Sequence, residues 1–396
     1  MKNYDWIVIG AGITGTALAY ELTKIGCSVL LLEQNQITDN ATVYSYGGLP
    51  YWAANTPITQ KLYKEGITRH RLLSQELMAD TQFRELDLIL TIPHDINPEI
   101  IHQSYQQCAI PPGLLTVQEA CKLEPLLHGD FLSGALTVKH GHIHPQKTAQ
   151  AYIQAMLNLG GEIQFQQFLE LTTTATKKCT GVKTNYTTFS SDNVVVCAGG
   201  ISRNLLQNMG IYSNSYDGYK IYFSHAEMIK TPPVYIKLNS LVLPANLQRL
   251  QLEMASTHTE ELWNQPNYEI VPPILDSGVV QFLDGSLCIG QISRIFTTPE
   301  ITVNSTNSTS SEKWLRESIT QILPSLANVP GTWHHCLVAF TADKLPLVGA
   351  IPEFSGLHIF SGFSSPLLIV PPLAVRFAKW ISGKKDDILA QLSPER

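Results

Sequence analysis

A glycine-rich turn between two apolar runs, near the start of the chain, constrains the fold more than any other feature. The buried-strand pattern of residues 6–9 is followed by G-x-G-x-x-G over residues 10–15, and then by an amphipathic helical pattern that Gly26 ends. A second apolar run, residues 29–32, leads directly into Glu33. Strand, glycine turn, helix and strand in this order predict a βαβ unit of the Rossmann type.

Each polar or glycine position of this motif has a physical reason to bind a dinucleotide. Gly10 permits the sharp turn, Gly12 lets the backbone approach a pyrophosphate, and Gly15 lets the helix pack against the strand. Glu33 lies where a carboxylate accepts hydrogen bonds from an adenosine ribose, and its charge repels a 2′-phosphate. The motif therefore predicts FAD or NAD rather than NADP. The alternative, an ordinary glycine turn, leaves this combination of residues unexplained.

The composition of the 396-residue chain suits a large globular enzyme, with 44% hydrophobic and 15% charged residues. Its length predicts two domains. The net charge of −6 argues against a nucleic-acid partner. We expect no signal peptide, because the N-terminus leads almost at once into the first predicted strand. We expect no transmembrane segment, because no uninterrupted apolar run reaches the roughly 18 residues of a membrane span. The seven cysteines contain no CxxC pair, which indicates free thiols and a cytoplasmic location.

Local patterns predict several connecting segments. Residues 41–50 are small, hydroxylated and glycine-rich, which predicts a loop lying against the cofactor. The polar low-complexity run at 305–311 predicts a mobile loop ahead of an amphipathic helix at 313–323. The final helix is expected over residues 372–382, after a proline-containing stretch, with the loop of residues 362–366 before it.

Five segments together resemble one known family. They are the glycine turn with Glu33, the strand and turn at 194–200, the hairpin at 283–290, the T-x-D-x-x-P-x-x-G pattern at 341–349 and the Gly362-Phe363-Ser364 loop. With them the chain resembles, over nearly its whole length, the D-amino-acid oxidase / glycine oxidase / sarcosine oxidase superfamily of FAD-dependent oxidoreductases. Taken singly, only the glycine turn is specific.

The resemblance implies an α/β fold with a Rossmann-like FAD-binding domain and a second, mainly antiparallel β substrate domain (α+β), both discontinuous in sequence. It assigns residues 1–50, 140–210 and 333–396 to the FAD-binding domain, and residues 51–139 and 211–332 to the substrate domain. FAD is the expected cofactor. The residues expected to bind it are Gly10, Gly12, Ile13, Thr14, Gly15, Glu33, Gln34, Thr42, Ser45, Gly47, Gly48, Leu169, Ala198, Gly199, Cys336, Gly362, Phe363, Ser364, Ser365, Pro366 and Leu367.

The resemblance also implies an activity. Enzymes of this superfamily oxidise a C–N bond of an amine or an amino or imino acid by hydride transfer to flavin N5, after which the imine hydrolyses and oxygen or another acceptor reoxidises the flavin. An FAD-dependent oxidase or dehydrogenase of a small-molecule amine is therefore expected. One alternative is a flavin dehydrogenase with a quinone or protein acceptor, acting on an amine or a hydroxy acid. Another is a non-catalytic FAD-binding subunit. The sequence makes no prediction of the oligomeric state.

Three positions depart from the family pattern. Val338 stands where amino-acid oxidases of this group carry an arginine that clamps the substrate carboxylate. Pro366 interrupts the loop that usually reads G-F-S-G-H-G and removes an N–H donor. Ile369 replaces a lysine of the sarcosine oxidase branch. These departures favour a secondary amine, a larger amine or a carboxylate-poor substrate over a simple α-amino acid.

Cys336 has two interpretations. It lies seven residues before Asp343, the spacing at which the sarcosine and pipecolate oxidase branch bonds a cysteine covalently to the flavin 8α-carbon. Free cysteines are also among the most frequently buried residues, so an unreactive strand cysteine fits as well. Because neither Val338 nor Ile369 follows that branch, both interpretations stay open.

The remaining candidates are pocket residues and a histidine group. Arg294, at the end of a predicted hairpin strand, is a candidate replacement for the missing carboxylate clamp, or else a solvated arginine. Tyr51 is a candidate pocket residue, although core packing explains an aromatic side chain equally well. His140, His142 and His144 share one face of a predicted strand, a pattern that suits zinc. No carboxylate or cysteine completes such a site, so we predict no metal.

Overall fold

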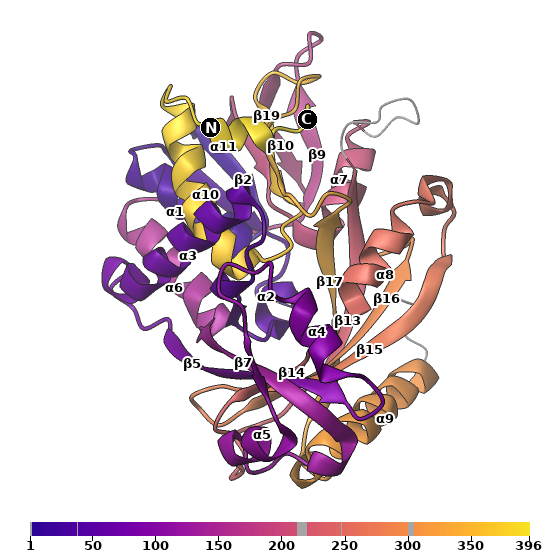
Figure 1. Ribbon diagram of the computed structural model, residues 1–396. Helices are drawn as coiled ribbons and strands as arrows, with labels where there is room; N and C mark the ends of the chain where they lie inside the picture. Colours follow the sequence, from indigo (N-terminus) through magenta and orange to yellow (C-terminus); the bar gives the residue numbers. More distant parts are fainter. Residues whose placement is uncertain (1, 38, 212–219, 247, 300–304) are drawn as a thin grey trace.

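The computed structural model describes residues 2–37, 39–211, 220–246, 248–299 and 305–396. The predicted substrate range 211–332 includes positions outside the described residues, and the predicted domain boundaries remain a proposal. In the described part of the chain, the strands form sheets of four, six and nine strands. A mixed α/β architecture with a largely parallel sheet and a largely antiparallel one confirms the predicted fold class (Figure 1).

The six-stranded sheet is built around the glycine motif. Its order is β18-β19-β12-β2-β3-β8, and all neighbours are parallel except the pair β18–β19. The strands are β2 (Trp6–Ile9), β3 (Val29–Glu33), β8 (Glu162–Phe165), β12 (Val194–Val196), β18 (Leu347–Ala350) and β19 (Leu357–Ser361). These segments come from the start, the middle and the end of the chain, as the predicted discontinuity requires.

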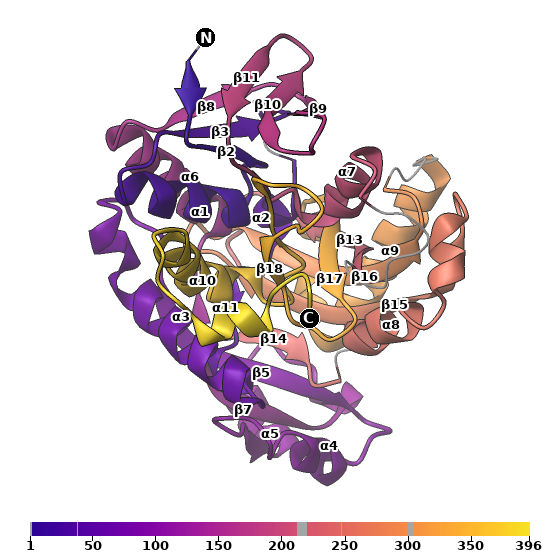
Figure 2. The same cartoon turned by 90° about the horizontal axis from the view of Figure 1, so that it is seen from above.

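Two layers cover this sheet, and Figure 2 shows them on opposite sides. One is the helical layer formed by α1 (Ile13–Lys24), α6 (Pro145–Asn158) and α10 (Pro366–Ile381). The other is the four-stranded sheet of β1 (Asn3–Tyr4), β9 (Phe168–Thr173), β10 (Cys179–Thr184) and β11 (Thr188–Ser191). Because both faces are covered, β2, β3 and β12 are apolar throughout rather than alternating.

The nine-stranded sheet has the order β17-β13-β16-β15-β14-β5-β7-β4, with β6 paired to β7. Its strands are β4 (Gly48–Leu49), β5 (Arg84–Pro93), β6 (Gly113–Leu115), β7 (Leu132–His142), β13 (Ile221–Lys230), β14 (Leu241–Pro244), β15 (Glu269–Gln281), β16 (Leu287–Phe296) and β17 (Thr332–Thr341). The helices beside it include α3 (Pro57–Glu76), α4 (Pro98–Ser104), α5 (Val117–Leu123), α8 (Gln248–Ser256) and α9 (Ser305–Ile322).

The two faces of this sheet bury different residues. We call inner the face that carries Ala226 of β13 and Cys336 of β17, which are register partners. It packs against aromatic residues that follow β3 in the chain. The outer face carries the alternate residues, such as Ile229 and Ile292, and packs against α9. Residue parity along each strand therefore determines which side chains face the cofactor-side segments.

The final helix begins six residues earlier than predicted. α10 starts at Pro366 and includes Pro371 and Pro372, each of which lacks the N–H that would bond the carbonyl four residues before it. His70 of α3 donates from Nε2 to the oxygen of Leu367, at 2.7 Å, and so satisfies the carbonyl that Pro371 leaves free. Pro366 itself occupies the first helical position, where the missing N–H has no intrahelical partner anyway.

One predicted loop is helical instead, and another begins with a single helical turn. The low-complexity run at 305–311 forms the first turns of α9, so the prediction of a mobile loop there is wrong. Apolar side chains later in α9, among them Leu315 and Ile319, pack on the outer face of the nine-stranded sheet. This packing stabilises the helix, which the serine-rich first turns alone do not favour. Within residues 41–50, Ala41–Tyr44 forms the single turn α2, which Asn40 caps by accepting from the backbone N–H groups of Thr42 and Val43.

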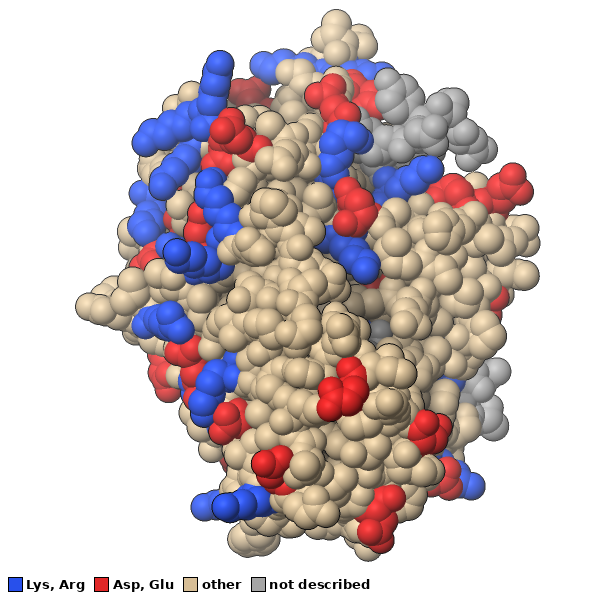
Figure 3. Space-filling view, in the orientation of Figure 1, with Lys and Arg blue, Asp and Glu red and all other residues tan. Residues whose placement is uncertain are grey.

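None of the helices within the described residues is both long and apolar enough to cross a bilayer. On the face shown in Figure 3, basic and acidic side chains are interleaved over the upper part of the molecule, and the lower middle part is largely uncharged.

Candidate functional site

The glycine turn has the geometry that close packing of β2 and α1 demands. Gly10 has φ +104°, and a Cβ added there would lie 2.8 Å from the carbonyl oxygen of Cys197. A Cβ at Gly15 would lie 1.8 Å from the oxygen of Gly10. The helix therefore starts directly at the end of the strand, with Ile13 and Thr14 in its first turn. Its first backbone N–H groups and its positive dipole end are directed to one place, which suits a phosphate.

Two side chains from later elements complete this helix start. Glu33, at the end of β3, accepts at Oε2 from the backbone N–H of Ala11, at 2.9 Å. Thr42 accepts at Oγ1 from the N–H of Ile13, also at 2.9 Å. A hydroxyl that accepts in this way still has its own proton to donate, so Thr42 suits a phosphate oxygen. The donor set and the carboxylate beside it fit the pyrophosphate and the ribose of a dinucleotide.

The loop after α2 is held close to two buried histidines. Gly47 has φ +76°, and an added Cβ would lie 2.2 Å from the oxygen of Ile143. At Gly48 the added Cβ would lie 2.8 Å from Nε2 of His140. Ser45 accepts at Oγ from the Gly47 N–H, at 3.3 Å. The loop can therefore lie flat on β7 only because both positions are glycine.

The histidine group of β7 has a packing role in the structure. Trp52 donates from Nε1 to Nδ1 of His140, at 3.0 Å, and burial lowers the pKa of His140 to about 3. His142 is buried next to the ring of Phe282, with a centroid distance of 5.3 Å. Among the residues that the structure describes, no group of three side chains is placed to hold a metal ion.

The second turn lies against the glycine turn, and the C-terminal loop lies against the T-x-D segment. Ala198 lies against Gly10, since the added Cβ there would be 3.2 Å from the Ala198 Cα, and Gly199 follows it with φ +53°. Gly362 has φ +79° and packs on Thr341 of the T-x-D segment. Ser364 donates from Oγ to the oxygen of Lys344, at 3.1 Å. The predicted cofactor segments are thus brought together from distant parts of the chain.

The other predicted positions have varied placements. Phe363 is buried against Phe360, with ring centroids 4.9 Å apart, and the hydroxyls of Ser365 and Tyr63 lie 3.2 Å apart. Pro366 and Leu367 belong to the first turn of α10. Gln34 is exposed after β3, and Leu169 is half exposed on β9. Tyr51 hydrogen-bonds Glu85, which together with burial raises its pKa, and it packs away from the inner face.

Val338 and Arg294 lie on opposite faces of the nine-stranded sheet. Val338 pairs with Ser224 on the inner face, and Cys336 lies two residues before it on the same face. Arg294 pairs with His225 on the outer face. There its Nε donates to Oε1 of Glu227, at 2.6 Å, and its Nη1 lies 3.6 Å from Glu269. Arg294, the predicted replacement for the carboxylate-binding arginine, therefore does not lie next to Val338.

A polar cluster that the sequence did not reveal lies on the inner face. Ser224 donates to Oε1 of Glu253 in α8, at 2.9 Å, and Nε of Arg249 lies 3.6 Å from the same oxygen. Asp276 of β15 accepts from the backbone N–H groups of residues 248 and 249, at 3.0 and 3.1 Å. Burial raises the pKa of Glu253 and that of Asp276. The cluster lies beside Tyr46, whose hydroxyl would be 3.1 Å from a Cβ added at Gly290.

The sequence holds only one feature of this cluster, and that feature is not specific. Arg249 and Glu253 are spaced i, i+4, which is common on solvated helix faces and so gave no indication of burial. Their placement depends on how α8 packs against β15, which no local pattern encodes.

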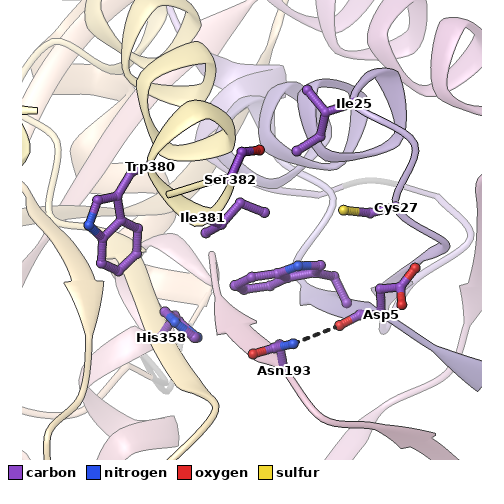
Figure 4. A pocket seen from close by; sticks show the side chains of 9 residues that line it. Asp5, Ile25, Cys27, Asn193, His358, Trp380, Ile381 and Ser382 are labelled. Atoms are coloured by element: carbon purple, nitrogen blue, oxygen red, sulfur yellow. Dashed lines mark hydrogen bonds between the residues drawn. The ribbon is translucent and has the colours of Figure 1, made fainter. Parts of the chain in front are cut away.

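A pocket of about 660 Å³ lies at the amino ends of the strands of the six-stranded sheet (Figure 4). Its lining includes Asp5, Asn193, His358 and Trp380, close to where β2, β12 and β19 begin. Because ligands of parallel α/β sheets bind at the carboxyl ends of the strands, this pocket is separate from the candidate cofactor site.

Comparison with known proteins shows the family to which the chain belongs. Residues 5–380 match the family model described as FAD dependent oxidoreductase. The oxidoreductase YurR of Bacillus subtilis is 23% identical over 419 residues, covering 100% of this chain and 98% of that protein. The 4-methylaminobutanoate oxidase (formaldehyde-forming) of Paenarthrobacter nicotinovorans is also 23% identical and covers 95% of this chain, but this chain spans only 43% of its length.

Among solved structures, glycine oxidase from Geobacillus kaustophilus superposes with a TM-score of 0.79 at 18% identity, covering 100% of this chain and 99% of that one. At that identity the likeness establishes the fold.

Proposed function

Because the chain belongs to the family of FAD-dependent oxidoreductases and is an FAD-dependent enzyme of the amine or amino-acid oxidase/dehydrogenase type, we propose that it oxidises a C–N bond of an amine or of an amino or imino acid. We further propose that the resulting imine hydrolyses. FAD, when bound, supplies the hydride acceptor at N5. A relative named for a methylated amine, 4-methylaminobutanoate, supports a secondary amine as the substrate.

One observation favours an amine over a hydroxy acid. The inner-face cluster contains two buried carboxyl groups, Glu253 and Asp276, and one guanidinium, that of Arg249. An excess of acidic groups attracts a substituted ammonium, whereas a hydroxy acid brings only negative charge to the same place. The two carboxyl groups therefore support an amine rather than a hydroxy acid as the substrate.

The residues of the chain have distinct roles in this proposal. The first turn of α1, Thr42 and Glu33 hold the cofactor by its pyrophosphate and ribose. An ammonium has to lose a proton before its α-carbon can give up a hydride. Glu253 is suited to accept that proton, because burial raises its pKa above its ordinary value and so makes the carboxylate a stronger base. Ser224, which donates to Glu253, orients the carboxylate.

Anaerobic flavin bleaching tests the proposed function. We expect at least one secondary amine or amino acid, in a panel that includes sarcosine, proline and 4-methylaminobutanoate, to remove the 450 nm flavin absorbance. Matched 2-hydroxy acids are the control and should leave it unchanged. Bleaching by the hydroxy acids alone would contradict the amine proposal, and a flavin that no compound bleaches would favour a non-catalytic subunit. Subsequent exposure to air separates an oxidase, which releases peroxide quickly, from a dehydrogenase.

We expect the flavin to be held without a covalent bond to Cys336. Burial raises the pKa of this thiol to about 12, so it stays protonated at neutral pH, and the protonated thiol is a poor nucleophile. Acid precipitation should therefore leave a colourless pellet and a yellow supernatant. A yellow pellet that turns colourless in Cys336→Ser would contradict this expectation and establish the thioether.

A further inference from the structure

The pocket at the amino ends of the six-stranded sheet has no part in the proposed reaction. Its volume of about 660 Å³ is within the range of sites for small organic ligands. Residues at the C-terminal ends of α1 and α10 line it together with residues in and beside β2, β12 and β19. In Figure 4, Trp380 and His358 lie on one side of this pocket, and Cys27 and Asp5 lie on the other. A ligand that fills it therefore contacts both helices and the sheet.

Aromatic rings form one part of the lining. The ring of His358 lies 4.7 Å from that of Trp6 and 6.0 Å from that of Trp380, measured between centroids. Trp6 is buried and Trp380 is half-buried, so an indole surface stays open to the pocket. The face of an indole attracts a cation as well as an apolar group. Burial lowers the pKa of His358 to about 4, so this ring is uncharged at neutral pH and does not repel a cation.

A carboxylate forms the opposite part. Among the described residues that line the pocket, Asp5 carries the one charged side chain. Ser28 donates to its Oδ2 from the backbone N–H and from Oγ, at 2.7 and 2.8 Å, and so fixes the carboxylate. Asn193 donates from Nδ2 to the backbone oxygen of Asp5, at 3.1 Å, which the dashed line in Figure 4 marks. The second carboxylate oxygen, Oδ1, accepts no hydrogen bond within the described part of the chain, so it is available to an ammonium group.

Two helix C-termini add negative partial charge at the same place. Ile25 and Ser382, the C-cap residues of α1 and α10, both line the pocket. The carbonyl groups at such helix ends favour a nearby cation. The last turns also carry Lys24 and Lys379, but neither side chain lines the pocket, and Lys24 is paired with Glu76 at 2.7 Å. The electrostatic surroundings of the pocket therefore attract a cation and disfavour an anion.

We propose that this pocket is a second ligand site, which binds an organic ammonium ion that carries an aromatic or branched apolar group. The ammonium lies beside Asp5, and the apolar group lies against Trp6 and Trp380. Because the pocket is at the amino ends of the strands, a ligand there does not reach the flavin site at the carboxyl ends. The site therefore binds its ligand without converting it. The inference does not depend on the substrate of the proposed reaction.

Benzyltrimethylammonium is a suitable probe, because its quaternary nitrogen has no lone pair and the compound is not expected to be oxidised as an amine. Calorimetric titration of the holoenzyme should show binding of this cation, whereas benzyl alcohol and phenylacetate, its neutral and anionic analogues, should bind at least about 10-fold more weakly. The flavin absorbance spectrum should not change during the titration. Equal affinity for the three compounds, or no binding of the cation, would overturn the proposal.

The thiol of Cys27 reports where the probe binds. Cys27 lines the pocket and is half-buried, as are Cys108 and Cys121, which do not line it. Alkylation of the unmodified holoenzyme with iodoacetamide, followed by mass spectrometry of the peptides, should show that the cation slows labelling of Cys27 alone. Binding that shifts the flavin spectrum and leaves the labelling of Cys27 unchanged would place the cation at the flavin site and contradict the assignment.

Substitutions test the two recognition elements separately. Asp5→Asn should weaken binding of the cation by about 5-fold, because it removes the charge of an exposed carboxylate and keeps its shape. Trp380→Leu should weaken it by about 10-fold through the loss of the indole face. Asp130→Asn makes the same charge change at a carboxylate that is 89% exposed and does not line the pocket, and it should leave the affinity unchanged. Unchanged affinity in both pocket variants, or an equal loss in Asp130→Asn, would show that the cation does not bind at this pocket.

Discussion

Replacing Gly10 by alanine is expected to yield a protein that no longer retains FAD. Gly10 has φ +104°, a conformation that costs a residue with a Cβ roughly 1–2 kcal/mol. The added Cβ would also lie 2.8 Å from the backbone oxygen of Cys197, which cannot rotate away as a side chain could. Relief requires the turn to move away from β12, and this movement also displaces the start of α1. We expect FAD affinity to fall by about 100-fold or more, since the first helical N–H groups lose their alignment on the phosphate.

Gly26→Ala is the matched control for this prediction. Gly26 ends the same α1 helix, has φ +97°, and has nothing within 4 Å of the position of an added Cβ. It therefore carries the same backbone strain without the clash, and it lies at the far end of the helix from the cofactor. Both variants should lose about 1 kcal/mol from the strain, but only Gly10→Ala should lose the flavin. Measuring the FAD dissociation constant by fluorescence of the released cofactor compares them; equal flavin retention in the two proteins would show that the clash is unimportant.

The cofactor half of the site could be predicted from the sequence because its determinants are local. Gly10, Gly15 and Glu33 lie within one βαβ unit, and backbone conformation forces their identity at each position. The substrate half could not be predicted in this way. The Arg249–Glu253 pair acquires its environment only from the packing of α8 on the inner face, and Arg294 is excluded from that environment by strand parity, which depends on the register of β16.

α10 illustrates the same limit in the fold. In the local sequence, Pro371 and Pro372 predict an interruption of the helix. The helix continues because His70, about three hundred residues earlier in the chain, donates to the carbonyl oxygen that Pro371 leaves without a donor. Such a compensation is a tertiary contact, so it overrides the local preference without leaving a trace in the segment itself.

Acidification below pH 6.5 is expected to destabilise the protein steeply, because several buried histidines are held neutral in the folded state. Burial lowers the pKa of three histidines to about 3, namely His140, His142 and His225. It lowers the pKa of His70 and of His358 to about 4. In the unfolded chain each returns to about 6.5. Below that value the unfolded state binds more protons than the folded state. The contribution of these neutral histidines to the free energy of unfolding is therefore fully present above about pH 7.5 and is lost as the pH falls.

The size of the effect follows from the number of groups. At pH 5.5 each such histidine has lost about 1.4 kcal/mol, so five give an upper limit of about 7 kcal/mol. Buried carboxyl groups oppose it, because burial raises the pKa of Glu21, Glu253 and Asp276, and they therefore bind protons in the folded state first. We expect a net loss of about 2–5 kcal/mol between pH 7.5 and 5.5, measured from urea unfolding with FAD in excess.

His358→Phe isolates one of these contributions. His358 lies among the rings of Trp6, Phe377 and Trp380, at centroid distances of 4.7, 5.9 and 6.0 Å, so a phenyl ring suits the same surroundings. Its Nδ1 has no hydrogen-bond partner among the described residues, which limits what the substitution removes. The pH dependence of stability should become shallower by about one proton, or about 1.4 kcal/mol per pH unit, between pH 6 and 5. The exposed His94→Gln should leave the slope unchanged, whereas a slope in His358→Phe equal to that of the unmodified protein would mean that His358 is already charged in the folded state.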